Sequence, residues 1–171
     1  MIAAELRKFF ESRGTRYHVY EHEPRYTAQE IADSVHVSGK HFAKTVLIRI
    51  DEDPETLALA VLPGHERIDF ARLGRQLGHA VALASEEVFQ RVFPGFELGA
   101  APPIADLASL PLSAVFVDSD LAKQDLIAFN AGTLTGVVEM QWAEFARLTQ
   151  PRIIDYGSVA ARAQPAPEAR A

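Results

Sequence analysis

The chain has 171 residues, of which 48% are hydrophobic and 23% charged, proportions usual for a globular protein with one domain and one core. No apolar run approaches the roughly 20 residues that span a bilayer, and the N-terminus lacks the apolar stretch of a signal peptide, so we expect no membrane partner and a cytoplasmic location. The net charge of −6 argues against broad nucleic-acid binding, and the lack of cysteine excludes disulfides and thiolate nucleophiles.

Helical and strand patterns alternate in the first half of the chain. Thr27 with Glu30 three residues later has the spacing of a capping box, which predicts the start of a helix. The predicted elements are a helix over 2–12 ended by Gly14, a strand over 16–21, a helix over 27–35, a hairpin of strands over 43–50 and 56–62, and a helix from Asp69 to Leu77 ended by Gly78.

The second half continues in the same mixed order. Its predicted elements are a strand over 80–83, a helix over 85–92, an irregular loop, strands over 113–117, 125–130 and 135–140, and a helix over 141–148. Residues 151–171 form a C-terminal tail, without periodicity from about Gly157 and disordered towards its end. The order predicts one α+β domain over 1–150, with a mixed, partly barrel-like β-sheet flanked by helices.

Taken alone, residues 27–46 also resemble a helix-turn-helix, the alternative that would make this a DNA-binding protein. Three features count against it. His36 replaces the usual turn glycine, the second helix would run into the strand-like sequence TVLIRI, and the chain is acidic. We therefore expect no DNA partner.

Few residues signal chemistry by their pattern alone. The six histidines form no H-x-x-x-H or H-E-x-x-H pair, and no glycine-rich nucleotide motif occurs, so we expect no metal and no cofactor. Lys44, at the start of a predicted strand, is either a solvated charge or a cation that binds a carbonyl or phosphate oxygen in a cleft. The glycine-proline loop, residues 94–103, is either an irregular crossing or a backbone wall that approaches a ligand closely.

A series of motifs over residues 15–148 resembles the YbaK/EbsC family, which is similar to the inserted editing domain of bacterial prolyl-tRNA synthetases. The segments that carry this resemblance, in chain order, are YEHEPRYTAQEIA, FAKTVLI, LAVLPGHERID, LASEEV, FPGFELGAAPP, FVDSDL and FNAGTLTGVVEM. No single segment is decisive, but this many in this order form a specific signal.

The resemblance implies a trans-editing hydrolase that cleaves the ester of a mischarged aminoacyl-tRNA bearing a small amino acid. A synthetase pocket discriminates poorly against a smaller side chain, so a second pocket that hydrolyses the error is needed. Lys44 falls on the family's functional lysine and is the implied catalytic residue. The positions implied to bind substrate are His22, Thr27, Gly95, Gly99, Pro103, Asp118, Asn130 and Gly132. The implied partners are the aminoacyl-tRNA 3′ end and, as a candidate, prolyl-tRNA synthetase.

One position departs from the family pattern. Many relatives carry a histidine shortly after the alanine and glycine of the FNAG segment, where this chain has Leu134. That departure and the acidic charge leave open an alternative function, a non-catalytic module of the same fold that binds a tRNA end or a synthetase. Lys44 and the glycine-proline loop favour the hydrolase.

Overall fold

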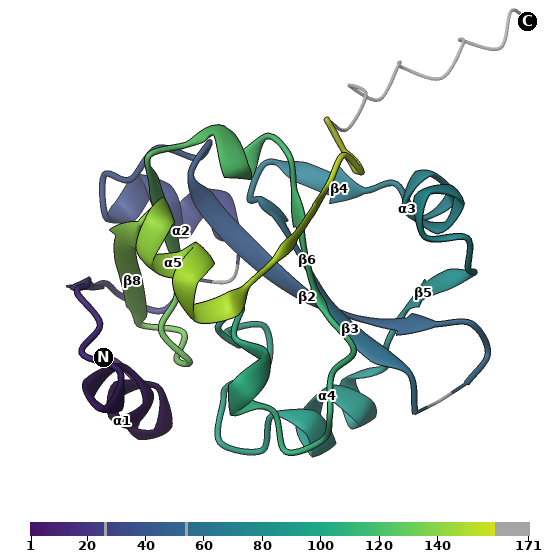
Figure 1. Ribbon diagram of the computed structural model, residues 1–171. Coiled ribbons are helices and arrows are strands. Elements are labelled where there is room, and N and C mark those ends of the chain that lie inside the picture. The colour runs from purple at the N-terminus through teal and green to yellow at the C-terminus, as the bar shows by residue number, and fades with distance from the viewer. Residues whose placement is uncertain (26, 54, 160–171) are drawn as a thin grey trace, which may run out of the picture.

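A computed structural model describes residues 1–25, 27–53 and 55–159 (Figure 1). The α-helices of this part are α1 (Ala4–Ser12), α2 (Ala28–Ser34), α3 (Phe70–Leu77), α4 (Glu86–Val92) and α5 (Trp142–Thr149). Short 3-10 helices are η1 (Ala105–Leu107) and η2 (Leu121–Lys123). The strands are β1 (His18–Glu21), β2 (Phe42–Ile50), β3 (Leu57–Pro63), β4 (Glu66–Ile68), β5 (Val81–Leu83), β6 (Val115–Asp118), β7 (Leu126–Asn130), β8 (Gly136–Gln141), β9 (Arg152–Ile154) and β10 (Gly157–Val159). None of these helices has the length and apolar character that a membrane crossing requires.

A mixed sheet forms the centre of the molecule, with the order β1-β8-β7-β2-β3-β6-β9 and with β5 also paired to β2. The central strand β2 is antiparallel to β3 and β5 and parallel to β7. The edge strands β1 and β9 do not pair with each other within the described ranges, so the sheet is open and is not a closed barrel. The predicted α+β class, the mixed sheet and the antiparallel β2–β3 pair are therefore confirmed.

The helices begin and end where their capping residues lie. Both halves of the capping box form at α2, where the Thr27 side chain accepts a hydrogen bond from the Glu30 N–H and the Glu30 side chain accepts from the Thr27 N–H. Asp69 caps α3 in the same way by accepting from the Arg72 N–H at 2.8 Å. Gly78 ends α3 in the left-handed conformation, with φ of 72°. Local sequence therefore fixes both helix starts.

Alternation along β2 divides the apolar core between the two faces of the sheet. Ala43 and Leu47 belong to the largest cluster, together with buried side chains of α1, α4 and α5. On the opposite face, Phe42 packs with buried residues of α2, and Ile48 packs in the cluster that includes Leu73 of α3. Lys44 lies on this second face between Phe42 and Ile48, so a charged residue interrupts the apolar packing at the middle of the molecule.

Three short strands were missed by the sequence analysis, namely β4, β9 and β10. Strands β9 and β10 fall in the segment that the sequence assigned to the tail, yet β9 pairs with β6 and β10 pairs with β4. Tyr156, between them, is fully buried, and its hydroxyl donates to the carbonyls of Val61 (2.8 Å) and Phe116 (3.0 Å). The folded structure thus continues to residue 159. The rest of the tail, residues 160–171, lies outside the described residues.

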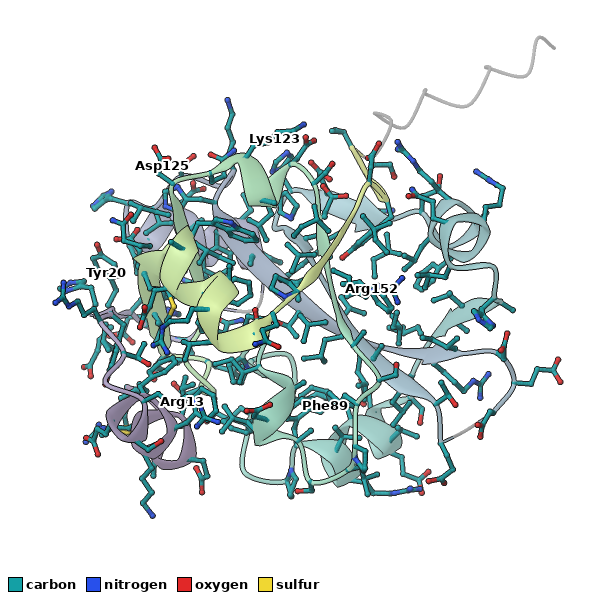
Figure 2. The ribbon with its side chains drawn as sticks, in the orientation of Figure 1. Arg13, Tyr20, Phe89, Lys123, Asp125 and Arg152 are labelled. Atoms are coloured by element: carbon teal, nitrogen blue, oxygen red, sulfur yellow. The ribbon has the colours of Figure 1, made fainter. Side chains whose placement is uncertain are left out.

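The helix-turn-helix alternative is wrong, because the segment that would form its second helix enters strand β2 at Phe42. Charged side chains lie at the surface of the molecule. Lys123 and Asp125, in the segment between β6 and β7, are examples (Figure 2).

Candidate functional site

The parallel pairing of β2 with β7 brings Lys44 and Asn130 together. The strand register places Phe42 opposite Ala128 and Ala43 opposite Phe129, so Lys44 and Asn130 occupy the next position along the two strands. Because side chains alternate between faces, Lys44 and Asn130 share the face that also carries Phe42 and Ala128. Two residues that are far apart in the sequence therefore meet beneath α2.

These two side chains line a cavity of about 190 Å³. The cavity lies between α2, strands β2 and β7, and the glycine-proline loop. Its lining residues are Arg25, Ala28, Ile31, Lys44, Leu98, Gly99, Asn130 and Leu134. We call this space the Lys44 cavity. It is smaller than the roughly 300–1,000 Å³ of a drug-sized ligand pocket, so its volume suits a small group.

The ammonium group of Lys44 sits in an environment that weakens its hold on a proton. Its Nζ donates a hydrogen bond to the backbone carbonyl of Glu66. Partial burial lowers the pKa of Lys44 below its ordinary value, and the nearby charge of Arg67 lowers it further, while the Glu66 carboxylate acts in the opposite direction. The result is a cation held in place at the cavity wall with reduced hydration.

Asn130 presents an acceptor that no described protein group uses. Its Nδ2 donates to the Gly99 carbonyl at 3.2 Å, and this contact fixes which end of the amide faces the loop. Its Oδ1 is buried and accepts no hydrogen bond from the part of the chain that the structure describes. Because an unsatisfied buried acceptor is costly, a ligand donor that reached Oδ1 would gain from the pairing.

The glycine-proline loop contributes Leu98 and Gly99 to the cavity, and Gly99 adopts the left-handed region with φ of 81°. Its N–H donates to no acceptor among the described residues. The loop continues through Pro103, which is buried and does not line the cavity. Gly95 also lies elsewhere, because a Cβ there would meet the Glu5 side chain at 3.3 Å.

Gly132 serves the packing of the same region. It has φ of 85°, and a Cβ at this position would lie 2.5 Å from Phe96 and 2.7 Å from Ala3. Its N–H donates to the Ala100 carbonyl, and its carbonyl accepts from the Glu97 N–H. Gly132 therefore joins the glycine-proline loop to the end of β7 without lining the cavity.

His22 and Thr27, also predicted from the sequence, do not line the Lys44 cavity. The Thr27 hydroxyl is occupied by the α2 capping box. Nδ1 of His22 lies 2.7 Å from the Glu23 carbonyl, whereas its Nε2 is buried and has no partner in the described ranges. Thr27 thus acts by starting the helix whose next turn supplies Ala28 and Ile31 to the cavity.

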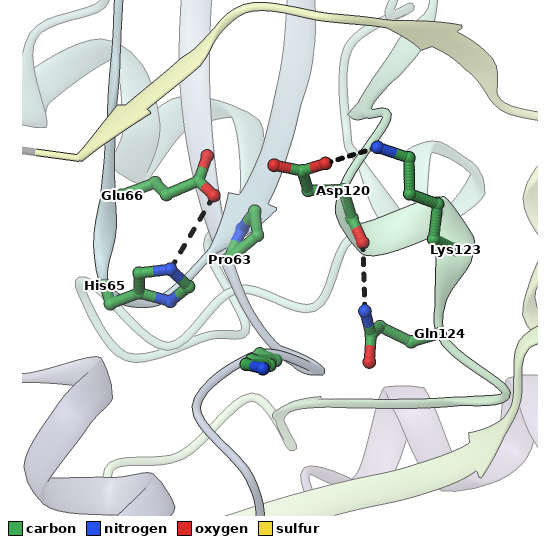
Figure 3. Close-up of a pocket in the computed structure, with 7 residues that line it drawn as sticks. Pro63, His65, Glu66, Asp120, Lys123 and Gln124 are labelled. Carbon is green, nitrogen blue, oxygen red and sulfur yellow. Dashed lines mark hydrogen bonds and ion pairs between the residues drawn. The ribbon is translucent and has the colours of Figure 1, made fainter.

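Asp118 does not line the Lys44 cavity and belongs to an acidic cluster with Glu66 and Asp120, whose ligand atoms are all within 4.8 Å of one another. Figure 3 shows Glu66 and Asp120 of this cluster. Asp118 Oδ2 accepts from the N–H groups of Tyr156 (2.9 Å) and Gly157 (2.7 Å), so it holds the turn between β9 and β10. These three carboxylates could approach a metal ion. However, Lys123 already pairs with Asp120 at 2.6 Å, and Asp118 is engaged by backbone N–H groups.

The structure thus brings together Lys44, Gly99 and Asn130 of the predicted residues. Sequence reasoning missed four lining residues, Arg25, Ala28, Ile31 and Leu98. The spacing of Ala28 and Ile31 puts both on one face of a helix, a signal that indicates only that this face is buried. Leu134, noted as a departure from the family pattern, lies at the cavity wall.

Comparison with known proteins gives a consistent result. Residues 22–148 match the model of a family described as the aminoacyl-tRNA editing domain. The chain is 30% identical over 99 residues to the multifunctional Ser/Thr-tRNA deacylase ProXp-y of Escherichia coli strain K12. That alignment covers 57% of this chain and 58% of the relative, so the chain spans little more than half the length of the curated protein it matches.

Solved structures with similar folds cover nearly the whole chain. One is a protein proposed to be a trans-editing enzyme for prolyl-tRNA synthetase, with a TM-score of 0.78 and 22% identity over 92% of this chain and 99% of that one. Another is a scaffold protein used for computational epitope grafting, with a TM-score of 0.77 and 22% identity over 90% of this chain and 95% of that one. At these identities the likeness concerns the fold.

Proposed function

Because the chain belongs to the family of aminoacyl-tRNA editing domains, we propose that it hydrolyses the ester that joins a small, wrongly attached amino acid to the 3′ end of a tRNA. The observation that carries this proposal is the convergence of Lys44, Gly99 and Asn130 on one small cavity. Their three polar groups match the polar groups of an aminoacyl ester, which has a carbonyl oxygen and an α-ammonium group beside each other.

The reaction requires only water as a second reactant. Water adds to the ester carbonyl, the bond from that carbon to the ribose oxygen breaks, and a proton passes to the ribose oxygen. The products are a free amino acid and an uncharged tRNA. The described residues of the cavity lining include no carboxylate, imidazole or thiol, so the proton of the attacking water passes to the substrate itself, through a hydroxyl of the terminal ribose.

Lys44 and the Gly99 N–H stabilise the negative charge that develops on the carbonyl oxygen. A preorganised donor at that position is worth about 10²–10³ in rate, and the partial burial of Lys44 strengthens its electrostatic effect because less water screens the charge. Asn130 Oδ1 accepts from the α-ammonium group and so sets the orientation of the aminoacyl group. Arg25, exposed at the cavity, is placed to meet the phosphate of the tRNA end.

The substrate implies further partners and a location. A chain with a net charge of −6 binds free tRNA weakly, because neutralising phosphates requires a cationic surface. Delivery of the substrate by a synthetase, with prolyl-tRNA synthetase as the candidate, offsets this weakness. Such a substrate places the activity in the cytoplasm.

The direct test incubates the purified protein with tRNAs that carry radiolabelled small amino acids, beside the variant Lys44→Ala. Release of one or a few amino acids by the wild type and its loss in the variant would establish the deacylase. No release from any member, even with prolyl-tRNA synthetase added, would contradict the hydrolase and favour a non-catalytic module that binds a tRNA end or a synthetase.

A further inference from the structure

The walls of the Lys44 cavity differ sharply in chemistry. The polar atoms come from Lys44, Asn130 and Gly99, with Arg25 exposed at the cavity. The remaining described side chains of the lining are hydrocarbon, from Ala28, Ile31, Leu98 and Leu134. None of the described residues that line the cavity carries a hydroxyl, thiol, imidazole or carboxylate.

This step rests on the deacylase function proposed above. In a bound aminoacyl ester, the polar atoms of Lys44 and Asn130 determine where the amino-acid side chain lies. The ester carbonyl oxygen pairs with Lys44, and the α-ammonium group pairs with Asn130 Oδ1. Lys44 and Asn130 lie side by side on one face of the sheet. Since both other substituents of the α-carbon are thereby held at the sheet, the amino-acid side chain projects towards the opposite wall, which α2 and the loops supply.

We infer that this cavity selects esters of small aliphatic amino acids and discriminates against serine and threonine. The hydroxyl of either residue would face the hydrocarbon groups of Ala28, Ile31 and Leu134, and these described side chains offer no partner for the hydrogen bonds that it loses with water. A methyl or ethyl group at the same place loses nothing on leaving water. The cavity volume of about 190 Å³ also limits the length of the side chain that fits.

Leu134 is the specificity-determining residue that the structure singles out. It stands in the loop between β7 and β8, and its backbone N–H donates to the Glu97 carboxylate, which fixes the loop against the segment before Gly99. A polar side chain at this position could pair with a substrate hydroxyl, whereas leucine cannot. If the inference holds, this chain differs in substrate from the relative named for Ser/Thr-tRNA.

The test uses pairs of esters that differ only in a methyl group replaced by a hydroxyl. One tRNA is charged by a non-specific acylating ribozyme with 2-aminobutyrate or serine, and separately with valine or threonine. We expect the kcat/KM for 2-aminobutyrate to exceed that for serine by about tenfold or more, in keeping with an unpaired hydroxyl. The valine and threonine pair, near the size limit, should show the same direction at lower rates.

Two variants make the source of the discrimination measurable. Leu134→Asn offers a hydrogen-bond partner and should reduce the ratio of 2-aminobutyrate to serine several-fold, whereas Leu134→Met, which stays apolar, should preserve it. Equal rates for the two esters, or faster release of serine by the wild type, would overturn the inference and leave the deacylase intact. Absence of hydrolysis for every ester would refute the proposed function on which it rests.

Discussion

The Asn130 side chain donates from Nδ2 to the carbonyl of Gly99 at 3.2 Å, and this contact ties strand β7 to the glycine-proline loop. The two residues come from segments that are distant in the chain, and both line the Lys44 cavity. Because the amide donates to the loop with one end, its oxygen must face away from the Gly99 carbonyl. A single hydrogen bond thus positions the loop and directs an acceptor that a substrate can use.

Asn130→Ala should lower kcat/KM for the best ester by about 10- to 100-fold, because it removes both the acceptor for the α-ammonium group and the anchor of the loop. Deacylation kinetics provide the measurement. Asn130→Asp is the matched variant, since it keeps an acceptor but loses the donor to Gly99, and it should retain part of the activity. An Asn130→Ala protein that folds normally and works within about twofold of wild type would contradict this role.

Lys44→Ala should lower kcat by about 10²–10³, the effect of removing one donor that stabilises an oxyanion. The loss should appear in kcat more than in KM, because the charge on the oxygen develops only in the transition state. Lys44→Met, which keeps the unbranched chain without the charge, is the control for packing. Circular dichroism should show both variants folded, and an unchanged kcat in either would exclude the role proposed for the ammonium group.

Gly132→Ala should destabilise the fold by about 2–4 kcal/mol, since the methyl group would collide with Phe96 and Ala3 and the residue has φ of 85°. Gly14→Ala is the control. Gly14 also has a positive φ, of 58°, but nothing lies within 4 Å of the point that an added Cβ would occupy, so only the backbone cost of about 1 kcal/mol remains. Urea unfolding measures the free energy of unfolding of both variants. If the two variants lost equal stability, the collisions predicted for Gly132→Ala would be absent.

The helices and strands that depend on neighbouring residues in the chain are the ones that the sequence predicts. The Thr27–Glu30 capping box and the β-branched, apolar run over 43–50 each depend on neighbours in the chain, and the predicted helix start and strand both appear in the structure. The cavity depends on long-range pairing. Lys44 and Asn130 meet only because β2 runs parallel to β7, and neither residue's local pattern indicates that pairing.

The same distinction explains the elements and contacts that sequence reasoning missed. Strands β4, β9 and β10 are short, with three residues each, and β9 and β10 form because β6 and β4 offer them backbone partners. Asp118 carries no local sign that its carboxylate would hold the turn between β9 and β10.

Glu66→Gln should make the stability of the protein less dependent on pH. Burial raises the pKa of Glu66, and the nearby Asp118 and Asp120 raise it further. A raised pKa means that the contribution of Glu66 to stability is fully present below about pH 4.3, the ordinary glutamate value, and is lost as the pH rises through the folded-state value. Urea unfolding of both proteins at several pH values from about 4.5 to 8 measures this. Parallel curves for wild type and variant would contradict the expectation.

The pH dependence of deacylation should identify the active form of Lys44. If the ammonium form stabilises the oxyanion, the protein-dependent rate falls as the pH rises through the Lys44 pKa, because the protonated fraction decreases. Burial and Arg67 lower that pKa, so the fall begins at a lower pH than an ordinary lysine, with a pKa of about 10.4, would give. The measurement is kcat against pH after subtraction of the spontaneous hydrolysis of the ester. Lys44→Arg, whose guanidinium stays charged throughout, is the control and should lack the fall at high pH. A wild-type rate that instead climbs through this range, beyond the spontaneous reaction, would mean that neutral Lys44 acts as a base.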